Sequence, residues 1–262
     1  MPLLLKKKVF SLALSSSQTE PRVGFLSAVF ALFLYIGITS LAMIAFGRIF
    51  SSKLLSHTHF VAASLAQIAT LIVCMLSLIG FSKIHSEGLQ SRIWGKNKWL
   101  KPLLKGMCLS IVCYPVVMLL VESIQLVVDQ FFDLARSDQL AVAQLKKLRS
   151  YPGLFWSFII CAVTVVPVLE ELLFRGFFQN YFVDLFGPKA GILLASLVFS
   201  GFHYSSEQGA TNIEMLVGLF ILSYLIGVTY LKEKSLFVAI GMHAAFNALG
   251  VLFVIFIKEG TS

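Results

Sequence analysis

Charge is scarce in this sequence. Asp, Glu, Lys and Arg make up only 13% of its 262 residues, whereas 58% are hydrophobic and 24 are Phe. Soluble domains carry about 25% charged and 45–50% apolar residues, so an ordinary water-facing surface is excluded. The apolar runs also leave no room for a separate soluble domain. We therefore expect an all-α protein, a polytopic helical bundle integral to a membrane.

Cysteine is scarce as well. The four cysteines lie inside apolar runs and show no CxxC spacing: Cys74, Cys108, Cys113 and Cys161. This pattern indicates neither a disulfide framework nor a thiolate zinc site, and packing is the expected role of these residues.

Long apolar runs bounded by charge predict the membrane spans. A bilayer core needs about 20 apolar residues in a helix. The runs are Gly24–Phe46, Phe60–Phe81, Leu103–Val128, Gly153–Val183, Pro188–Tyr204, Ile213–Leu231 and Ser235–Ile257. The fourth is too long for one simple span and the fifth is slightly short. The count is seven spans, or eight if the fourth run breaks at Pro167.

The basic residues predict the orientation. They lie between apolar runs rather than in one stripe, so we expect contact with the bilayer and no nucleic-acid partner. Residues 1–23, with Lys6, Lys7 and Lys8, lack the apolar core of a signal peptide and are expected to be cytoplasmic or interfacial. The loops on the same side then hold Lys83, Arg92, Lys96, Lys98 and Lys101, against Arg48 and Lys53 in the first outer loop, as the positive-inside rule favours.

The expected organisation is one transmembrane domain over residues 24–257, with a motif core at 153–257 and a short tail at 258–262. A bacterial-type plasma membrane is the expected location.

Two loops carry much of the remaining charge. The loop Asp129–Ser150 would lie outside and includes Arg136, Lys146, Lys147 and Arg149, which weakens the predicted orientation. Its apolar residues, such as Leu145 and Leu148, lie on or near one helix face and predict an interfacial amphipathic helix. Glu207 and Glu214, in and after the loop that follows His203, are expected to be solvated.

Ionisable residues near the centre of a membrane helix are costly, by about 2.5 kcal/mol or more on insertion scales. Those that do not fit loops or span ends form three motifs in the late runs. The motifs are Glu170-Glu171-Leu-Leu-Phe-Arg175, Phe199-Ser-Gly-Phe-His203 and His243-Ala-Ala-Phe-Asn247. Each has a structural explanation: a buried salt bridge, an interfacial histidine, and an interhelical hydrogen-bond pair. Three such features on separate late helices favour one polar cavity instead.

The two carboxylates of the first motif point in different directions. Glu171 and Arg175 are four residues apart on one helix face and can form an ion pair, whereas Glu170 points about 100° away. A carboxylate in an apolar wall without a cation suits a general base or acid. Glu171 and Arg175 would then orient Glu170 or bind substrate.

The combined motifs fit an activated water. Glu170 and His203 could hold it, with Glu170 taking a proton as the water attacks a peptide carbonyl. His243 and Asn247 lie four residues apart and could stabilise the oxyanion. Simple alternation of spans, however, places Glu170 and His203 at opposite depths. Either the run Gly153–Val183 is a long tilted helix with Glu170 near its middle, or it breaks and re-enters.

In this order, on late hydrophobic segments, the three motifs resemble those of the CPBP family, the CAAX protease and bacteriocin-processing (Abi) proteins, which includes the type II CAAX prenyl endopeptidases. The resemblance runs from Glu170 to Asn247. It implies that Glu170 and His203 activate the water and that His243 and Asn247 form the oxyanion site. Glu171, Arg175 and Phe199 are the supporting residues. The implied substrate is a hydrophobic peptide or a lipidated protein, prenylated or with a leader peptide.

Several alternatives remain open. A glutamate protease without a cofactor is preferred, but a metalloendopeptidase-like variant could bind zinc through Glu170, His203 and His243. The HExxH helix typical of such enzymes is absent. Buried Glu and His also build the proton relays of transporters, although no repeat of two related halves is visible. A non-catalytic membrane scaffold is the third alternative.

Overall fold

The computed structural model describes residues 22–49, 56–96, 98–132 and 136–256. These form α2 (Phe25–Ile49), α3 (Ser56–Lys83), α4 (Glu87–Trp94), α5 (Leu100–Phe131), α6 (Leu140–Leu148), α7 (Pro152–Val163), α8 (Val165–Glu171), the π-helix η1 (Leu172–Gln179), α9 (Asn180–Gly201), the 3-10 turn η2 (Ser206–Gln208), α10 (Thr211–Glu233) and α11 (Leu236–Phe256). The predicted all-α class is confirmed. Lys6, Lys7, Lys8, Lys53, the side chain of Arg48 and the predicted tail at 258–262 lie outside the described residues, as does the predicted N-terminal segment up to residue 21.

Within the described residues, six helical stretches are long and apolar enough to cross a membrane. They are Phe25–Phe46, Phe60–Lys83, Leu100–Phe131, Pro152–Gly201, Thr211–Glu233 and Leu236–Phe256. The protein is therefore a polytopic helical membrane bundle. The difference from the predicted seven spans lies in the fourth stretch, where 50 residues join two of the predicted runs.

The fourth stretch turns sharply at Gly187. This glycine has φ 80° and ψ 170°, a conformation essentially restricted to glycine, and Pro188 follows it. After the turn, α9 packs back against η1. Glu170 precedes Gly187 by 17 residues and His203 follows it by 16, so the two legs bring both residues to a similar depth. The run that carries Glu170 is thus the long helix with Glu170 near its middle, one of the two arrangements left open by the sequence.

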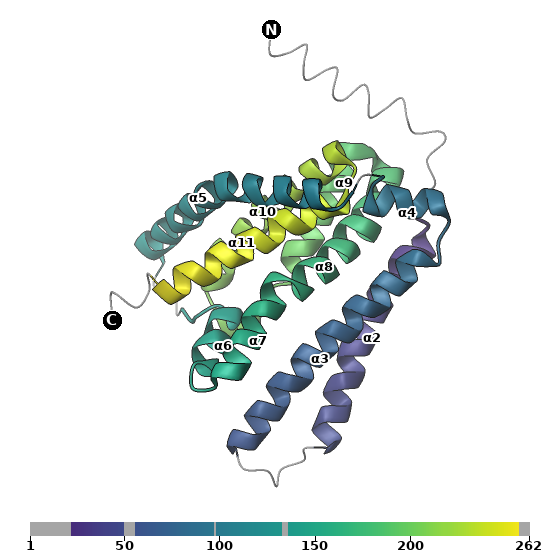
Figure 1. The fold of residues 1–262 in the computed structure, drawn as a ribbon. Coiled ribbons are helices and arrows are strands. Elements are labelled where there is room, and N and C mark those ends of the chain that lie inside the picture. Colours follow the sequence, from purple (N-terminus) through teal and green to yellow (C-terminus); the bar gives the residue numbers. More distant parts are fainter. Residues whose placement is uncertain (1–21, 50–55, 97, 133–135, 257–262) are drawn as a thin grey trace.

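The predicted break at Pro167 is displaced. The backbone leaves the helical region at Thr164 (φ −126°, ψ −64°), three residues before the proline, and α7 and α8 continue in nearly the same direction (Figure 1). Pro167 has no N–H to donate to the preceding turn, which explains why the helix weakens there. The helix predicted within the loop Asp129–Ser150 is present as α6, with Leu145 and Leu148 buried.

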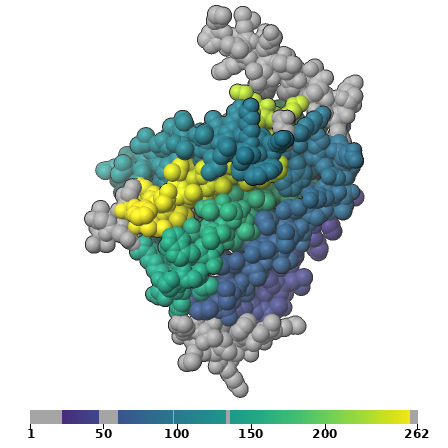
Figure 2. Space-filling view, viewed as in Figure 1, coloured from purple at the N-terminus to yellow at the C-terminus, as the bar shows by residue number. Residues whose placement is uncertain are grey.

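The α7–α8 run lies between two helix pairs (Figure 1). The hairpin of α2 and α3 packs on one side, through α3, and α11 with α5 packs on the other. Figure 2 shows α11 in yellow seated between α5 and α7. The backbones of α5 and α11 approach closely, since a Cβ at Gly106 would lie 2.1 Å from Val238 O and one at Gly241 would lie 2.1 Å from Leu103 O. This small-residue packing fixes α11, which carries His243.

Candidate active site

The first motif lies at a change of helix type. Glu170 and Glu171 end α8, and Arg175 lies in η1, where the backbone bonds run from residue i to i+5. Side chains of this segment bind successive turns of α10: Gln179 Nε2 donates to Gly227 O at 2.9 Å, and Asn180 Nδ2 donates to Tyr230 Oη at 2.8 Å. Single π-helical turns are frequent at functional sites.

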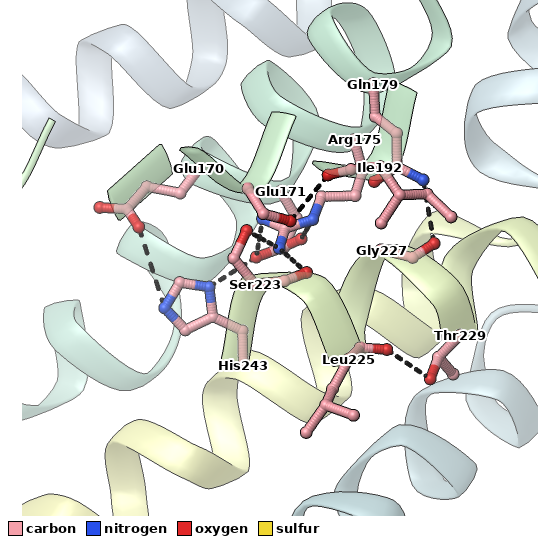
Figure 3. Close-up of polar contacts among 11 residues, drawn as sticks. Glu170, Glu171, Arg175, Gln179, Ile192, Ser223, Leu225, Gly227, Thr229 and His243 are labelled. Atoms are coloured by element: carbon pink, nitrogen blue, oxygen red, sulfur yellow. Dashed lines mark hydrogen bonds and ion pairs between the residues drawn. The ribbon is translucent and has the colours of Figure 1, made fainter. Parts of the chain in front are cut away.

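The predicted ion pair between Glu171 and Arg175 is present and fully enclosed. Their exposed fractions are 0% and 1%. Arg175 Nη1 donates to Glu171 Oε1 at 3.1 Å, and Nε lies 3.1 Å from Oε2. Arg175 Nη2 also donates to the backbone O and to Oγ of Ser223, each at 2.9 Å (Figure 3). The guanidinium lies 5.0 Å from the ring centroid of Phe199. The buried cation therefore has partners on every side.

His243 faces both carboxylates of the first motif. Its Nδ1 lies 2.7 Å from Glu171 Oε1, and its Nε2 lies 3.8 Å from Glu170 Oε2 (Figure 3). A carboxylate only accepts, so Nδ1–H donates to Glu171. Glu171 thus binds His243 directly, and Arg175 binds the same carboxylate.

His203 is oriented in the same way. Its Nδ1 lies 2.9 Å from Phe199 O, and a carbonyl oxygen only accepts, so Nδ1–H is the donor. Its Nε2 is then directed at Glu170 Oε2, 4.0 Å away. Phe199 is fully buried and supports both rings, with its centroid 4.9 Å from that of His203 and 5.9 Å from that of His243. Two imidazole Nε2 atoms therefore face one carboxylate.

Glu170 is the uncommitted member of the site. Its side chain is 16% exposed, but Oε2 is buried and has no hydrogen-bond partner among the described residues. A buried acceptor without a donor costs about 1–3 kcal/mol. An unpaired buried acceptor of this kind, between two histidines, needs a specific explanation.

Asn247 occupies a different position. It lies one turn beyond His243 on α11, and its Nδ2 donates to Ala162 O at 2.9 Å, close to the break between α7 and α8. No contact described for Asn247 joins it to Glu170 or His203 in this part of the chain. The amide has a second N–H, which this bond leaves unused.

Comparison of the chain with known families gives a match that includes all of these site residues. Residues 152–249 match the sequence model of a family described as Type II CAAX prenyl endopeptidase Rce1-like. This region is an Rce1-like family domain. The match confirms the resemblance drawn from the three motifs, all of which it contains. Comparisons with curated proteins and with solved structures gave no match.

The Rce1-like domain begins at α7 and contains every residue of the candidate site. The chain is thus an integral membrane protein with a domain of a protease family. Helices α2 to α6 lie outside the matched region, although α3 and α5 pack against helices of the domain.

Zinc ligation was tested on the donor atoms of the Rce1-like domain. Among the described residues, no group of three or more His, Cys, Asp or Glu side chains is placed to hold a metal ion. Glu170 Oε2 lies 3.8 and 4.0 Å from the two Nε2 atoms. Neighbouring donors of a tetrahedral zinc lie about 3.4 Å apart for bonds near 2.1 Å. The donor types fit zinc, but their spacing is about half an ångström too wide.

Sequence reasoning missed Ser223. Its hydroxyl and carbonyl bind Arg175, 48 residues earlier in the chain. On the same helix, Thr229 Oγ1 only donates to Leu225 O of its own backbone (Figure 3). A hydroxyl in an apolar run is compatible with either behaviour, so no signal in the sequence separates the two residues.

Proposed function

We propose that this chain is an intramembrane endopeptidase in which Glu170 activates a water molecule. The observation that carries the proposal is the position of Glu170 Oε2, buried and uncommitted, opposite Nε2 of His203 and of His243. The family match at residues 152–249 supports the same reaction class. Glu171, by contrast, is fully buried and already bound, which leaves Glu170 as the base.

The water is held between Glu170 and His203. With Nδ1–H donated to Phe199 O, a neutral His203 has a lone pair on Nε2. A water that makes bonds of about 2.8 Å to Nε2 and to Glu170 Oε2 would sit beside the line between these atoms, because they are only 4.0 Å apart. One of its hydrogens then points to each acceptor, and its own lone pair is free to attack.

The reaction proceeds by general base and then general acid catalysis. The water oxygen bonds to the peptide carbonyl carbon as Glu170 takes one of its protons, and the carbonyl oxygen becomes an oxyanion. When the tetrahedral intermediate collapses, the C–N bond breaks and Glu170 returns the proton to the leaving amine. No net proton is gained or lost by the enzyme.

His243 is proposed to stabilise the oxyanion. The carboxylate of Glu171 accepts from Nδ1–H, so Nε2 faces the site, and in the imidazolium form Nε2–H would donate to the oxyanion. Arg175 binds that carboxylate and holds it in place. The second N–H of Asn247, one turn further along α11, is proposed to assist.

The proposed substrate is a membrane-associated peptide with a lipid or another apolar anchor. The family description names CAAX prenyl endopeptidases, which points to a prenylated peptide. Glu170 and His203 have side chains that are 16% and 31% exposed, whereas Glu171 and Arg175 are enclosed. The substrate therefore reaches the site from the side of Glu170 and His203.

The proposed topology has seven spans with the N-terminus in the cytoplasm. The turn at Gly187 separates the fourth span from the fifth. Contacts such as Arg92–Asp184 and Lys105–Glu233 show that α4, the turn at Gly187, the start of α5 and the end of α10 lie at one end of the bundle. This end is mainly basic. Its basic residues are Lys83, Arg92, Lys96, Lys98, Lys101, Lys105, Lys189, Lys232 and Lys234. At the other end Arg136, Lys146, Lys147 and Arg149 are accompanied by Asp129, Asp138, Glu207 and Glu214, so the basic end is proposed to face the cytoplasm.

The test is cleavage of a fluorogenic, prenylated CAAX peptide by purified protein in liposomes. Wild type is expected to cleave it, and Glu170→Gln is expected to lose at least about 10²-fold in kcat because the base is removed. Glu122→Gln is the matched control, since Glu122 is an exposed acid within α5. Wild-type turnover by Glu170→Gln would overturn the mechanism. No cleavage of prenylated or unprenylated hydrophobic peptides by wild type would overturn the function.

A further inference from the structure

His203 lies outside a regular helix. α9 ends at Gly201, and the His203 loop, residues 202–210, connects it to α10. A histidine held only by a helix end moves with its loop. The contacts of the loop therefore act together with Phe199 in aiming Nε2 of His203 at Glu170.

Asn212, at the start of α10, ties the loop back on itself. Its Oδ1 accepts from Ser205 N and from Gln208 Nε2, each at 3.2 Å. Its Nδ2 donates to Ser205 O at 2.6 Å and to Gly209 O at 3.1 Å. The residue is 7% exposed, and these four bonds use the full capacity of a side-chain amide. The arrangement fixes Ser205, Gln208 and Gly209 of the loop to one side chain.

A second segment crosses the His203 loop from outside the family domain. This strap, residues 136–140, precedes α6 and forms an antiparallel bridge between Arg136 and Gly209. Ser137 Oγ donates to Glu207 O at 2.7 Å, and Thr211 Oγ1 donates to Ser137 O at 2.8 Å. The N–H of Leu140 donates to Gln208 Oε1 at 3.0 Å. The strap thus contacts residues 207–209 of the loop and Thr211 at the start of α10.

Arg136 anchors the strap. Its Nε donates to Asp129 Oδ1 at 2.6 Å, at the end of α5, and its Nη1 donates to Oε1 of Glu214 in α10. Glu214 is only 3% exposed, so the prediction that this acid is solvated is wrong; Glu207 is exposed, as predicted. A buried carboxylate is retained where a cation binds it, and here the pair joins the strap to the helix that follows the His203 loop.

We propose that Asn212 and Arg136 are positioning residues that act through His203. Asn212 and the strap together form a clamp on the His203 loop, and the strap reaches this loop from outside the Rce1-like domain. The catalytic consequence rests on the proposed function. Loosening the clamp lets Nε2 of His203 drift from Glu170, which lowers kcat while leaving substrate binding nearly intact. Small misplacements of a catalytic group cost up to about 10²-fold in rate.

The first variant is Asn212→Asp, which keeps the shape of the side chain but replaces the donor Nδ2 with an acceptor oxygen that faces the acceptors Ser205 O and Gly209 O. We expect kcat for a prenylated CAAX peptide to fall roughly tenfold or more, with KM within about twofold. Lys147→Ala is the control, because Lys147 is an exposed cation on α6 and no contact described for it joins it to the strap or to the His203 loop. It is expected to behave as wild type.

The second variant addresses Arg136. Arg136→Ala would strand the buried Glu214 carboxylate and could unfold the protein, so Arg136→Met/Glu214→Gln removes both charges together. This double variant is expected to show the same fall in kcat. Arg136→Lys, which can still pair with Glu214, is expected to recover most of the activity.

A measurement that does not depend on peptide cleavage tests the clamp independently of the proposed protease function. The rate at which diethyl pyrocarbonate modifies each histidine is followed by mass spectrometry. Asn212→Asp is expected to change the rate at His203 severalfold and to leave the rate at His85, between α3 and α4, unchanged. An unchanged rate at His203 would overturn the proposal even if the wild type is a protease. A parallel change at all histidines with a fall in Tm would show a general structural role and would overturn it too. If the wild type cleaves no peptide but His203 responds alone, the clamp stands and the protease function fails.

Discussion

Nδ1 of His243 lies 2.7 Å from Oε1 of Glu171, and Arg175 binds the same carboxylate. The three side chains are almost completely buried, with exposed fractions of 4%, 0% and 1%. These contacts form an Arg175–Glu171–His243 relay, which joins two motifs whose residues Glu171 and His243 are 72 positions apart in the chain. It leaves Nε2 as the only ring nitrogen of His243 that can act on a substrate.

Glu171→Gln is expected to impair both stability and catalysis. The neutral amide leaves Arg175 as an unpaired buried cation, which costs about 3–5 kcal/mol in the free energy of unfolding. The amide can also turn its NH2 group toward Nδ1 of His243, which favours the wrong tautomer of that ring, so kcat should fall by about 10²-fold or more. Thermal unfolding and peptide cleavage measure the two effects. The double variant Glu171→Gln/Arg175→Met should recover stability but not activity; recovery of both would mean that the relay has no catalytic part.

Ser223→Ala tests the other side of Arg175. The substitution removes a hydrogen bond between a hydroxyl and a charged group, worth about 1.5–3 kcal/mol, and should lower kcat severalfold. Ser196→Ala is a matched control, because Ser196 is equally buried at 1% but donates only to Ile192 O of its own helix. We expect the control to unfold close to wild type. Equal effects of the two variants on unfolding and on kcat would contradict this role for Ser223.

The motifs and the ion pair were predictable because they rest on local rules. Glu171 and Arg175 are four residues apart on a helix, and charges in apolar runs are rare enough to attract attention. The Gly187-Pro188 pair between two predicted runs also marks a turn in the sequence. These features depend on neighbours in the chain.

The remaining features depend on distant parts of the chain. The π-helical turn at Leu172–Gln179 has no hydropathy signature, and it is held by α10, about 50 residues later. The sequence predicts Glu214 to be a solvated acid, because only the fold brings Arg136, 78 residues away, beside it. The amide of Asn247 binds the carbonyl of Ala162, which is accessible because the helix breaks at Thr164. Each depends on tertiary packing, which hydrophobic periodicity does not encode.

Chelation is expected to leave the activity intact. Glu170 Oε2 lies about half an ångström too far from Nε2 of each histidine for the three to share a zinc ion, and no step of the proposed mechanism uses a metal. The measurement is peptide cleavage before and after dialysis against a strong chelator, with the metal content of the same samples determined by mass spectrometry. Loss of activity that zinc alone restores would instead support ligation by Glu170, His203 and His243.

Cysteine labelling tests the proposed orientation. Lys98 and Glu207 are both exposed and lie near opposite ends of α10, since Lys105 pairs with Glu233 at its C-terminal end and Glu207 precedes its start. In a variant lacking the four native cysteines, Lys98→Cys should be labelled only after the membrane is permeabilised. Glu207→Cys should react with an impermeant maleimide in intact cells. The reverse pattern would place the basic end outside.

Gly187→Ala tests whether the turn sets the register of the site. At φ 80° and ψ 170° an alanine is strained, although nothing lies within 4 Å of the position its Cβ would take, so the penalty is conformational rather than steric with neighbours. We expect a loss of about 1–3 kcal/mol in the free energy of unfolding. Gly80→Ala is the control, because Gly80 is helical with equally open surroundings and should be neutral or stabilised by up to about 1 kcal/mol. Since the turn brings Glu170 and His203 to the same depth, Gly187→Ala should also lower kcat in the protein that remains folded, and an unchanged kcat would show that the packing of α9 on η1 sets the register without it.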